Sequence, residues 1–68
     1  MMWEHPEEGY SFLRYNKDLA TVTQLEDGRW RWEVYRNTDI SIDMDGWWGI
    51  CSTEELAQKE AEVNLGVK

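Results

Sequence analysis

The dipeptide Asp27-Gly28 lies between two runs of alternating apolar and polar residues, and it constrains the fold more than any other part of this 68-residue chain. Asp-Gly is a strong signal for a β-hairpin, because a type I′ turn needs two residues that tolerate positive φ. We therefore expect antiparallel strands at residues 19–26 and 29–36. A two-residue turn pairs Thr23 with Trp32 and places the following side chains on the core face: Leu19, Thr21, Thr23, Leu25, Trp30, Trp32 and Val34. Such alternation is typical of a sheet with one face in a core and the other in water.

Similar patterns predict the rest of the sheet. Residues 10–15 read as a strand that ends at a turn over 16–18, and residues 40–44 and 47–51 read as two strands joined at Asp45-Gly46. Trp47 and Trp48 are consecutive, so they cannot both point to the same face of a regular strand. We expect one of these two indole rings to lie outside the main core. Residues 1–9 lack any such pattern and read as an irregular arm.

The segment after the last of these strands predicts a helix. Ser52 and Glu55 have the spacing of a capping box, with Ser52 as the N-cap and Glu55 at the third helical position. The helix is expected to run from residue 53 to about residue 64, with Gly66 as its stop. Its narrow apolar face would consist of Leu56, Ala57, Ala61 and Val63.

Together these elements predict a single α+β domain over residues 1–68. A meander of four to five antiparallel strands packs one face on a C-terminal helix, which makes two layers. The irregular arm takes residues 1–9, the antiparallel sheet residues 10–52 and the helix residues 53–65. A chain of this length buries only about 60% of the surface that its unfolded form exposes, so its core is small.

Cysteine usage and hydropathy indicate the compartment. Cys51 is the only cysteine, so no disulfide forms within one chain, and a lone cysteine fits a reducing environment. The first residues have neither the basic region nor the apolar run of a secretory signal, and no stretch reaches the length of a membrane span. We expect a cytoplasmic protein, in the producing cell or in a host cell, with no membrane partner.

The charge balance is acidic and uneven. The chain has 14 acidic and 7 basic side chains, a net charge of −7, and residues 37–68 hold seven of the acids but only two of the bases. Affinity for nucleic acid comes largely from Lys and Arg, so direct binding to nucleic acid is disfavoured. The same charge favours steering toward a basic partner.

Few residues could carry chemistry. Asp43 and Asp45, close to Gly46, resemble part of an EF-hand calcium-binding loop. In that alignment Ser41 and Ser52 would take the first and last ligand positions, where the loop needs Asp and Glu. His5 is the sole histidine and lies in the arm, so neither a metal site nor a catalytic pair with Cys51 is favoured. We expect no catalytic residue, no metal and no cofactor, and therefore a protein that is not an enzyme.

Five tryptophans in 68 residues supply more aromatic surface than so small a core needs. Trp30 and Trp32 lie among arginines, as in platforms that stack single-stranded nucleic acid. The alternation instead places both rings on the core face and the arginines on the other face with Glu33. The surplus aromatic surface beside carboxylates favours a protein-binding patch, for a foreign partner or for a second copy of the chain.

One resemblance spans residues 29–64. A hairpin with Trp30-Arg31-Trp32, followed by a Trp-Gly strand that runs into Ser-Thr-Glu-Glu-Leu-Ala and a short acidic helix, resembles many small phage and prophage proteins. Some of these are similar to anti-CRISPR and other anti-defence inhibitors. The resemblance matches no specific motif and transfers no functional residue. It implies a small acidic inhibitor that occupies a basic, nucleic-acid-binding surface of a host protein or nucleoprotein complex, in some cases by mimicking nucleic-acid charge.

The residues expected to bind this partner combine carboxylates for steering with apolar anchors. The carboxylates are Asp39, Asp43, Asp45, Glu54, Glu55 and Glu62, and the anchors are Trp47 and Tyr35. The alternative is a homodimeric structural or adaptor module.

Overall fold

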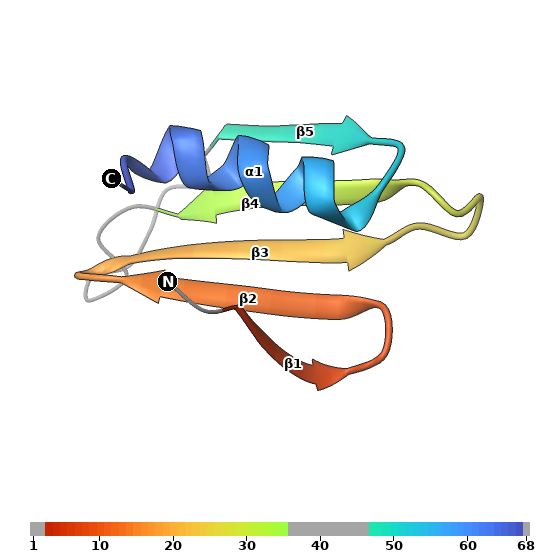
Figure 1. Ribbon diagram of the computed structural model, residues 1–68, viewed down its shortest axis with the longest axis horizontal. Helices are drawn as coiled ribbons and strands as arrows, with labels where there is room; N and C mark the ends of the chain where they lie inside the picture. Colours follow the sequence, from red (N-terminus) through yellow and green to blue (C-terminus); the bar gives the residue numbers. More distant parts are fainter. Residues whose placement is uncertain (1–2, 36–46, 68) are drawn as a thin grey trace.

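A computed structural model of the protein describes residues 3–35 and 47–67. The strands are β1 (Glu4–Glu7), β2 (Tyr10–Tyr15), β3 (Asp18–Gln24), β4 (Trp30–Tyr35) and β5 (Trp47–Cys51), and the helix is α1 (Glu54–Leu65). The strands form one antiparallel sheet in the order β1-β2-β3-β4-β5, which is also their order in the chain (Figure 1). The predicted α+β meander with one C-terminal helix is therefore confirmed.

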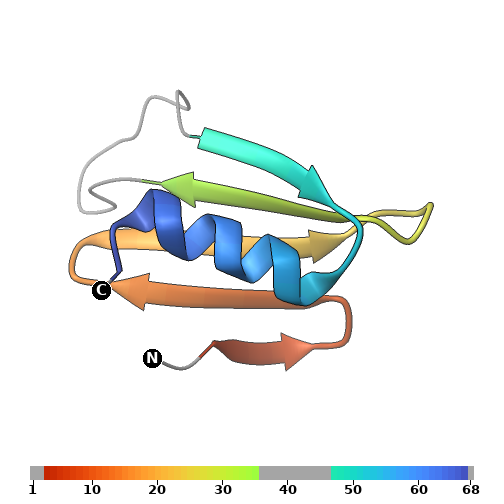
Figure 2. The same cartoon turned by 45° about the horizontal axis from the view of Figure 1, so that its top comes forward.

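The helix covers one face of this sheet and leaves the other face without a covering element among the described residues (Figure 2). Beneath α1 lies a small core of buried side chains. Its members are Leu13, Ala20, Val22, Trp32, Val34, Ala57, Ala61 and Leu65. No helix in the described ranges has the length and apolar character needed to span a membrane.

The irregular arm predicted for residues 1–9 is wrong, because residues 4–7 form the edge strand β1. Glu4 pairs with Phe12 and Glu7 pairs with Tyr10, with an irregularity between the two pairs. All four residues of β1 are exposed, so the strand has no apolar alternation that could have revealed it. The strand predicted at residues 40–44 lies outside the described residues.

The predicted hairpin between β3 and β4 exists, but its predicted register is wrong by one residue. Val22, not Thr23, lies opposite Trp32. The Leu25 N–H donates to the Arg29 carbonyl at 2.7 Å and the Gly28 N–H donates to the Leu25 carbonyl at 3.0 Å, with Gly28 at φ 92°. These bonds describe a three-residue loop that ends in a left-handed glycine, rather than a two-residue type I′ turn.

The extra loop residue moves the side chains of β3 to the opposite faces, since alternation has a period of two. Ala20 and Val22 are fully buried under α1, whereas Leu19, Thr21 and Thr23 lie on the uncovered face. On β4 the predicted core face is correct, because Trp32 and Val34 are buried.

The helix begins one residue later than predicted. Its N-cap is Thr53, whose Oγ1 accepts a hydrogen bond from the Leu56 N–H at 3.2 Å, so Ser52 is not the cap. The predicted stop is confirmed, since Gly66 adopts φ 88° and its N–H donates to the Glu62 carbonyl. The predicted apolar face is wrong in part: Ala57 and Ala61 are buried, but Leu56 and Val63 are 49% and 69% exposed, and Leu65 completes the buried face.

Gly49 explains how the tryptophan-rich strand β5 fits beside β4. Gly49 lies opposite Trp32, and a Cβ atom at this position would stand 2.6 Å from the Trp32 Nε1 atom. The indole ring of Trp32 therefore fills the space that a side chain would need. Trp48 is 57% exposed on the uncovered face, which agrees with the prediction that one of the two consecutive tryptophans lies outside the core.

Candidate functional site

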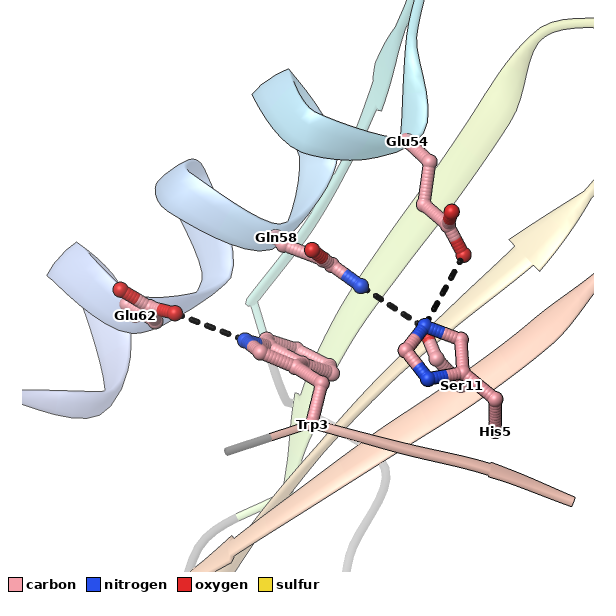
Figure 3. Close-up of polar contacts among 6 residues, drawn as sticks. All are labelled: Trp3, His5, Ser11, Glu54, Gln58 and Glu62. Atoms are coloured by element: carbon pink, nitrogen blue, oxygen red, sulfur yellow. Dashed lines mark hydrogen bonds and ion pairs between the residues drawn. The ribbon is translucent and has the colours of Figure 1, made fainter. Parts of the chain in front are cut away.

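Three polar contacts connect one side of α1 to the first two strands (Figure 3). The Trp3 indole N–H donates to Glu62 Oε2 at 2.7 Å, and the Gln58 amide donates to the Ser11 hydroxyl at 3.2 Å. At the N-terminal end of the helix, His5 Nε2 lies 3.8 Å from Glu54 Oε2. Positions 54, 58 and 62 recur every four residues, so they share one side of the helix. Ser11 is fully buried, and Gln58 satisfies its hydroxyl.

A hollow of about 380 Å³, which we call the acidic pocket, opens beside the first turn of α1. Its walls come from β1 and the turn after it, from the end of β3, from the start of β4 and from the helix. The lining residues are His5, Glu7, Glu8, Gly9, Gln24, Trp30 and Glu54. The Gln24 N–H donates to the Gly9 carbonyl at 2.8 Å, which fixes the turn against β3.

The acidic pocket brings three carboxylates together with one aromatic ring. Glu7, Glu8 and Glu54 carry negative charge, and no Lys or Arg lines the hollow. Trp30 is partly buried against the core and contributes an apolar wall. This combination can bind a lysine or arginine side chain. The carboxylates would pair with its positive charge, and the indole face would contact its aliphatic stem and its cationic group.

The structure separates the residues predicted to bind a partner. Glu54 lines the acidic pocket, Glu55 is exposed on the next position, and Glu62 is hydrogen-bonded to Trp3. Tyr35 lies on the uncovered face of the sheet, on the far side of the sheet from the helix. Asp39, Asp43 and Asp45 lie outside the described residues, and of Trp47 only the backbone is described, as the first residue of β5.

A second group of polar residues lies around Tyr35 on the uncovered face. Burial and a hydrogen bond with Glu33 raise the pKa of Tyr35 above its ordinary value. Arg31 Nη2 lies 3.5 Å from Glu33 Oε2, and the Arg31 guanidinium carbon stands 4.4 Å from the centre of the Trp48 ring. These groups therefore satisfy one another within the sheet surface.

Cys51 lies at the end of β5 beside a shallow hollow of about 290 Å³. Burial, and secondarily the charge of Glu60, raise the pKa of its thiol above the ordinary value. A thiol with a raised pKa stays protonated at neutral pH, which is the less nucleophilic form. In residues 3–35 and 47–67, no three His, Cys, Asp or Glu side chains are placed to hold a metal ion.

Of the seven residues that line the acidic pocket, only Glu54 is among those predicted to bind a partner; sequence reasoning missed His5, Glu7, Glu8, Gly9, Gln24 and Trp30. The glutamates Glu7 and Glu8 fall in the segment predicted to be an irregular arm, and Trp30 was predicted to lie on the core face. The signal that could have found them is weak, because a strand without apolar residues gives no periodicity. Comparison of the chain with protein-family models, with curated proteins and with solved structures finds no match.

Proposed function

We propose that the protein is a non-enzymatic protein-binding module that docks on a basic surface of a larger partner, with the acidic pocket receiving a lysine or arginine side chain. The observation that carries this proposal is the composition of the pocket: three carboxylates, the Trp30 ring and the His5 imidazole surround one hollow that no Lys or Arg lines.

The distribution of charge supports the same function. Glu54 and Glu55 lie in the first turn of α1, and Glu54 shares the pocket with Glu7 and Glu8 from the end of β1 and the turn after it. A net charge of −7 attracts basic surfaces over long range and raises the rate of encounter. In this arrangement Glu55 contributes to steering, while Glu54 makes the direct contact.

The resemblance to anti-defence inhibitors extends the proposal to a partner class. In a phage setting the basic surface would belong to a nucleic-acid-binding groove of a host defence complex in the cytoplasm, and the protein would act as an inhibitor by covering it. Such a groove presents the rows of Lys and Arg that the acidic pocket would accept.

The pocket can be tested without knowing the partner. Isotope-labelled protein is titrated with N-acetyl-arginine amide, and the NMR signals of the Trp30 indole N–H and the Gly9 amide are followed. Both signals are expected to shift, and Glu54→Gln is expected to weaken binding about 1.4- to 5-fold, the range of a solvent-exposed ion pair. Glu55→Gln removes the same charge from the adjacent position, where it contributes only to steering, and should weaken binding less than Glu54→Gln does.

Three results would count against the proposal. The first is an equal response to N-acetyl-norleucine amide, which has an aliphatic side chain but no positive charge. The second is an equal loss in Glu54→Gln and Glu55→Gln, because binding would then depend on total charge and not on the pocket. At the level of a natural partner, a pull-down from host lysate at low salt that recovers no basic protein would also count against it.

A further inference from the structure

The two outer strands of the sheet differ in how their edges are protected. Among the residues that the structure describes, β1 and β5 each pair with a neighbour on one side only (Figure 2). β1 has the sequence Glu-His-Pro-Glu. Charged side chains and a proline on an edge discourage further strand pairing. β5 has the sequence Trp-Trp-Gly-Ile-Cys, with no charge and no proline, so its edge lacks the features that keep another strand away.

The hydrogen-bonding pattern shows which way the backbone groups of β5 point. The Leu25 N–H donates to the Arg29 carbonyl, so this pair belongs to the bonded set of the β3–β4 ladder. Bonded and non-bonded pairs alternate along an antiparallel ladder. The backbone groups of Trp32, three residues beyond Arg29, therefore point away from β3 and toward Gly49, the partner of Trp32 in β5. Gly49 in turn directs its own backbone groups toward β4.

Trp48 and Ile50, on either side of Gly49, direct their backbone N–H and C=O groups to the free edge, because the direction alternates from one residue to the next. Their side chains are 57% and 40% exposed. Backbone groups on an open edge can pair with an extended chain, whose own N–H and C=O groups have the matching spacing. The edge of β5 therefore offers an added strand a ladder of donors and acceptors.

A hollow of about 290 Å³, which we call the edge hollow, lies between the end of β5 and α1. Its lining residues are Cys51, Ser52, Leu56, Lys59, Glu60 and Val63. Leu56 and Val63 lie on the side of the helix opposite to Gln58, which reaches Ser11 in β2. Both are apolar, yet they are 49% and 69% exposed. The helix thus keeps two large apolar side chains in water beside the edge of β5.

The edge hollow has the dimensions for alternate side chains of a strand. Leu56 and Val63 lie about two helical turns apart, roughly 10.5 Å along the axis. Side chains on one face of an extended segment recur about every 6.8 Å. Two such side chains of an added strand therefore fit along the stretch of helix between Leu56 and Val63, and apolar ones would bury the exposed surface of both.

Charge distinguishes between the chains that could supply this strand. The sequence of α1, EELAQKEAEVNL, holds four glutamates and one lysine, a net charge of −3. A second copy of the protein paired edge to edge on β5 would bring its own α1 close to this one, and the two anionic helices would repel. A foreign segment with lysine or arginine on either side of its apolar residues would be attracted instead.

We propose that the β5 edge and the edge hollow bind an extended segment of another protein by strand addition. The segment has alternating apolar residues flanked by Lys or Arg. Its backbone pairs with Trp48 and Ile50, and its apolar side chains enter the edge hollow against Leu56 and Val63. The sheet order puts β5 and β1 at opposite edges. This site is therefore separate from the acidic pocket and does not rest on the function proposed above.

A synthetic peptide tests the strand addition. The probe is the heptapeptide Lys-Thr-Leu-Thr-Leu-Thr-Lys with acetylated and amidated ends, titrated into isotope-labelled protein. The amide signals of Trp48, Ile50 and Leu56 should shift, and those of β1 should stay in place. In an extended strand the N–H groups of the leucines and of the threonines point to opposite edges.

Two N-methylated forms of the peptide use this difference. One carries N-methyl groups on both leucines and the other on two of the threonines, so they have the same composition. One form should lose affinity by about tenfold or more, because its methyl groups block the edge that meets β5, and the other should lose less than about threefold. An equal loss in both forms would overturn strand addition.

Variants of the protein test the edge hollow. Leu56→Ala keeps a good helix former but removes an apolar wall, and it should raise the dissociation constant of the heptapeptide by about fivefold or more. Glu55→Gln, at an exposed neighbouring position outside the hollow, is the control and should change the constant less than about twofold. Glu54→Gln should weaken N-acetyl-arginine amide in the acidic pocket without a comparable effect on the heptapeptide, so the two sites can fail separately. Circular dichroism and urea unfolding check that each variant is folded.

Three results would overturn the proposal. The first is a heptapeptide that does not bind at concentrations up to about 1 mM. The second is a set of shifts confined to β1 and Gly9, which would mean that the lysines of the peptide bind only in the acidic pocket. The third is equal or tighter binding of a heptapeptide with glutamate in place of both lysines, because the anionic helix should repel it.

Discussion

The indole N–H of Trp3 donates a 2.7 Å hydrogen bond to the carboxylate of Glu62, which joins two residues 59 positions apart in the sequence. The bond connects the segment before the edge strand β1 to the last turns of α1. The four residues of β1 are exposed, so this strand has little apolar burial of its own to hold it. We infer that the contact between Trp3 and Glu62 is a main attachment of β1 to the helix layer.

Replacing Trp3 tests this attachment. Trp3→Phe keeps an aromatic ring but removes the donor, and it should lower the free energy of unfolding by about 1 kcal/mol, the usual contribution of one hydrogen bond. Amide hydrogen exchange in β1 should accelerate more than exchange in β3 and β4, because the loss is local. Glu55→Gln, on an exposed position of the same helix, is the control. Unchanged exchange in β1 would show that other contacts hold the strand.

The start of α1 can be tested at two adjacent hydroxyl residues. Thr53→Ala removes the oxygen that accepts from the Leu56 N–H and should cost about 1 kcal/mol of stability, as N-cap replacements typically do. Ser52→Ala removes a hydroxyl of the same kind one residue earlier and should cost much less. Urea unfolding of the two variants measures the difference. A larger loss in Ser52→Ala would place the cap where the capping-box pattern predicted it.

Gly49 is expected to be intolerant of any side chain. Gly49→Ala would place a methyl group 2.6 Å from the Trp32 Nε1 atom, so the indole or the strand must shift. Overpacking of this kind should destabilise the protein by about 1–3 kcal/mol. In a Trp32→Phe background the clashing part of the indole is absent, so the same substitution should cost less. A double-mutant cycle by chemical unfolding measures this coupling, and strict additivity would contradict it.

Asp27 should make the β3–β4 loop sensitive to acid. The Arg29 backbone N–H and then the Arg29 side chain bond to its carboxylate, at 3.0 and 2.7 Å, and hold its pKa below the ordinary 3.8. Because the folded-state pKa is the lower one, the stabilisation is complete at neutral pH and is lost as the pH falls from about 3.8 through the folded-state value. Wild type should therefore melt above Asp27→Asn at pH 7, and the difference should shrink below pH 3. A difference that is constant with pH would exclude this linkage.

The architecture was predictable because the strand patterns and the helix signals lie close together in the sequence. The register of the β3–β4 hairpin was not predictable from the sequence. Asp-Gly occurs both in two-residue type I′ turns and in three-residue loops that end in a left-handed glycine. Glu26 belongs to the loop rather than to β3, and nothing in the local pattern distinguishes the two cases. One residue of loop length then decides whether Leu19 or Ala20 is buried.

The acidic pocket depends on contacts that no local pattern contains. Glu8, Trp30 and Glu54 come from separate parts of the chain, and only the completed sheet brings them around one hollow. The same applies to Glu62, whose acidic character suggested a steering role while its partner Trp3 lay in a segment predicted to be irregular. Sequence reasoning identified the residue types for binding, but long-range pairing decides which of them share a surface.

The agreement between strand order in the sheet and strand order in the chain has a consequence for folding. Each strand pairs with the one made just before it, so most strand contacts are local in the sequence and sheet formation should be fast. The element that shields Val22 and Val34 from water, however, follows every strand in the chain. A folding intermediate in which the sheet has formed and α1 has not yet docked would expose these apolar side chains to water, and at that stage the chain is most prone to aggregate.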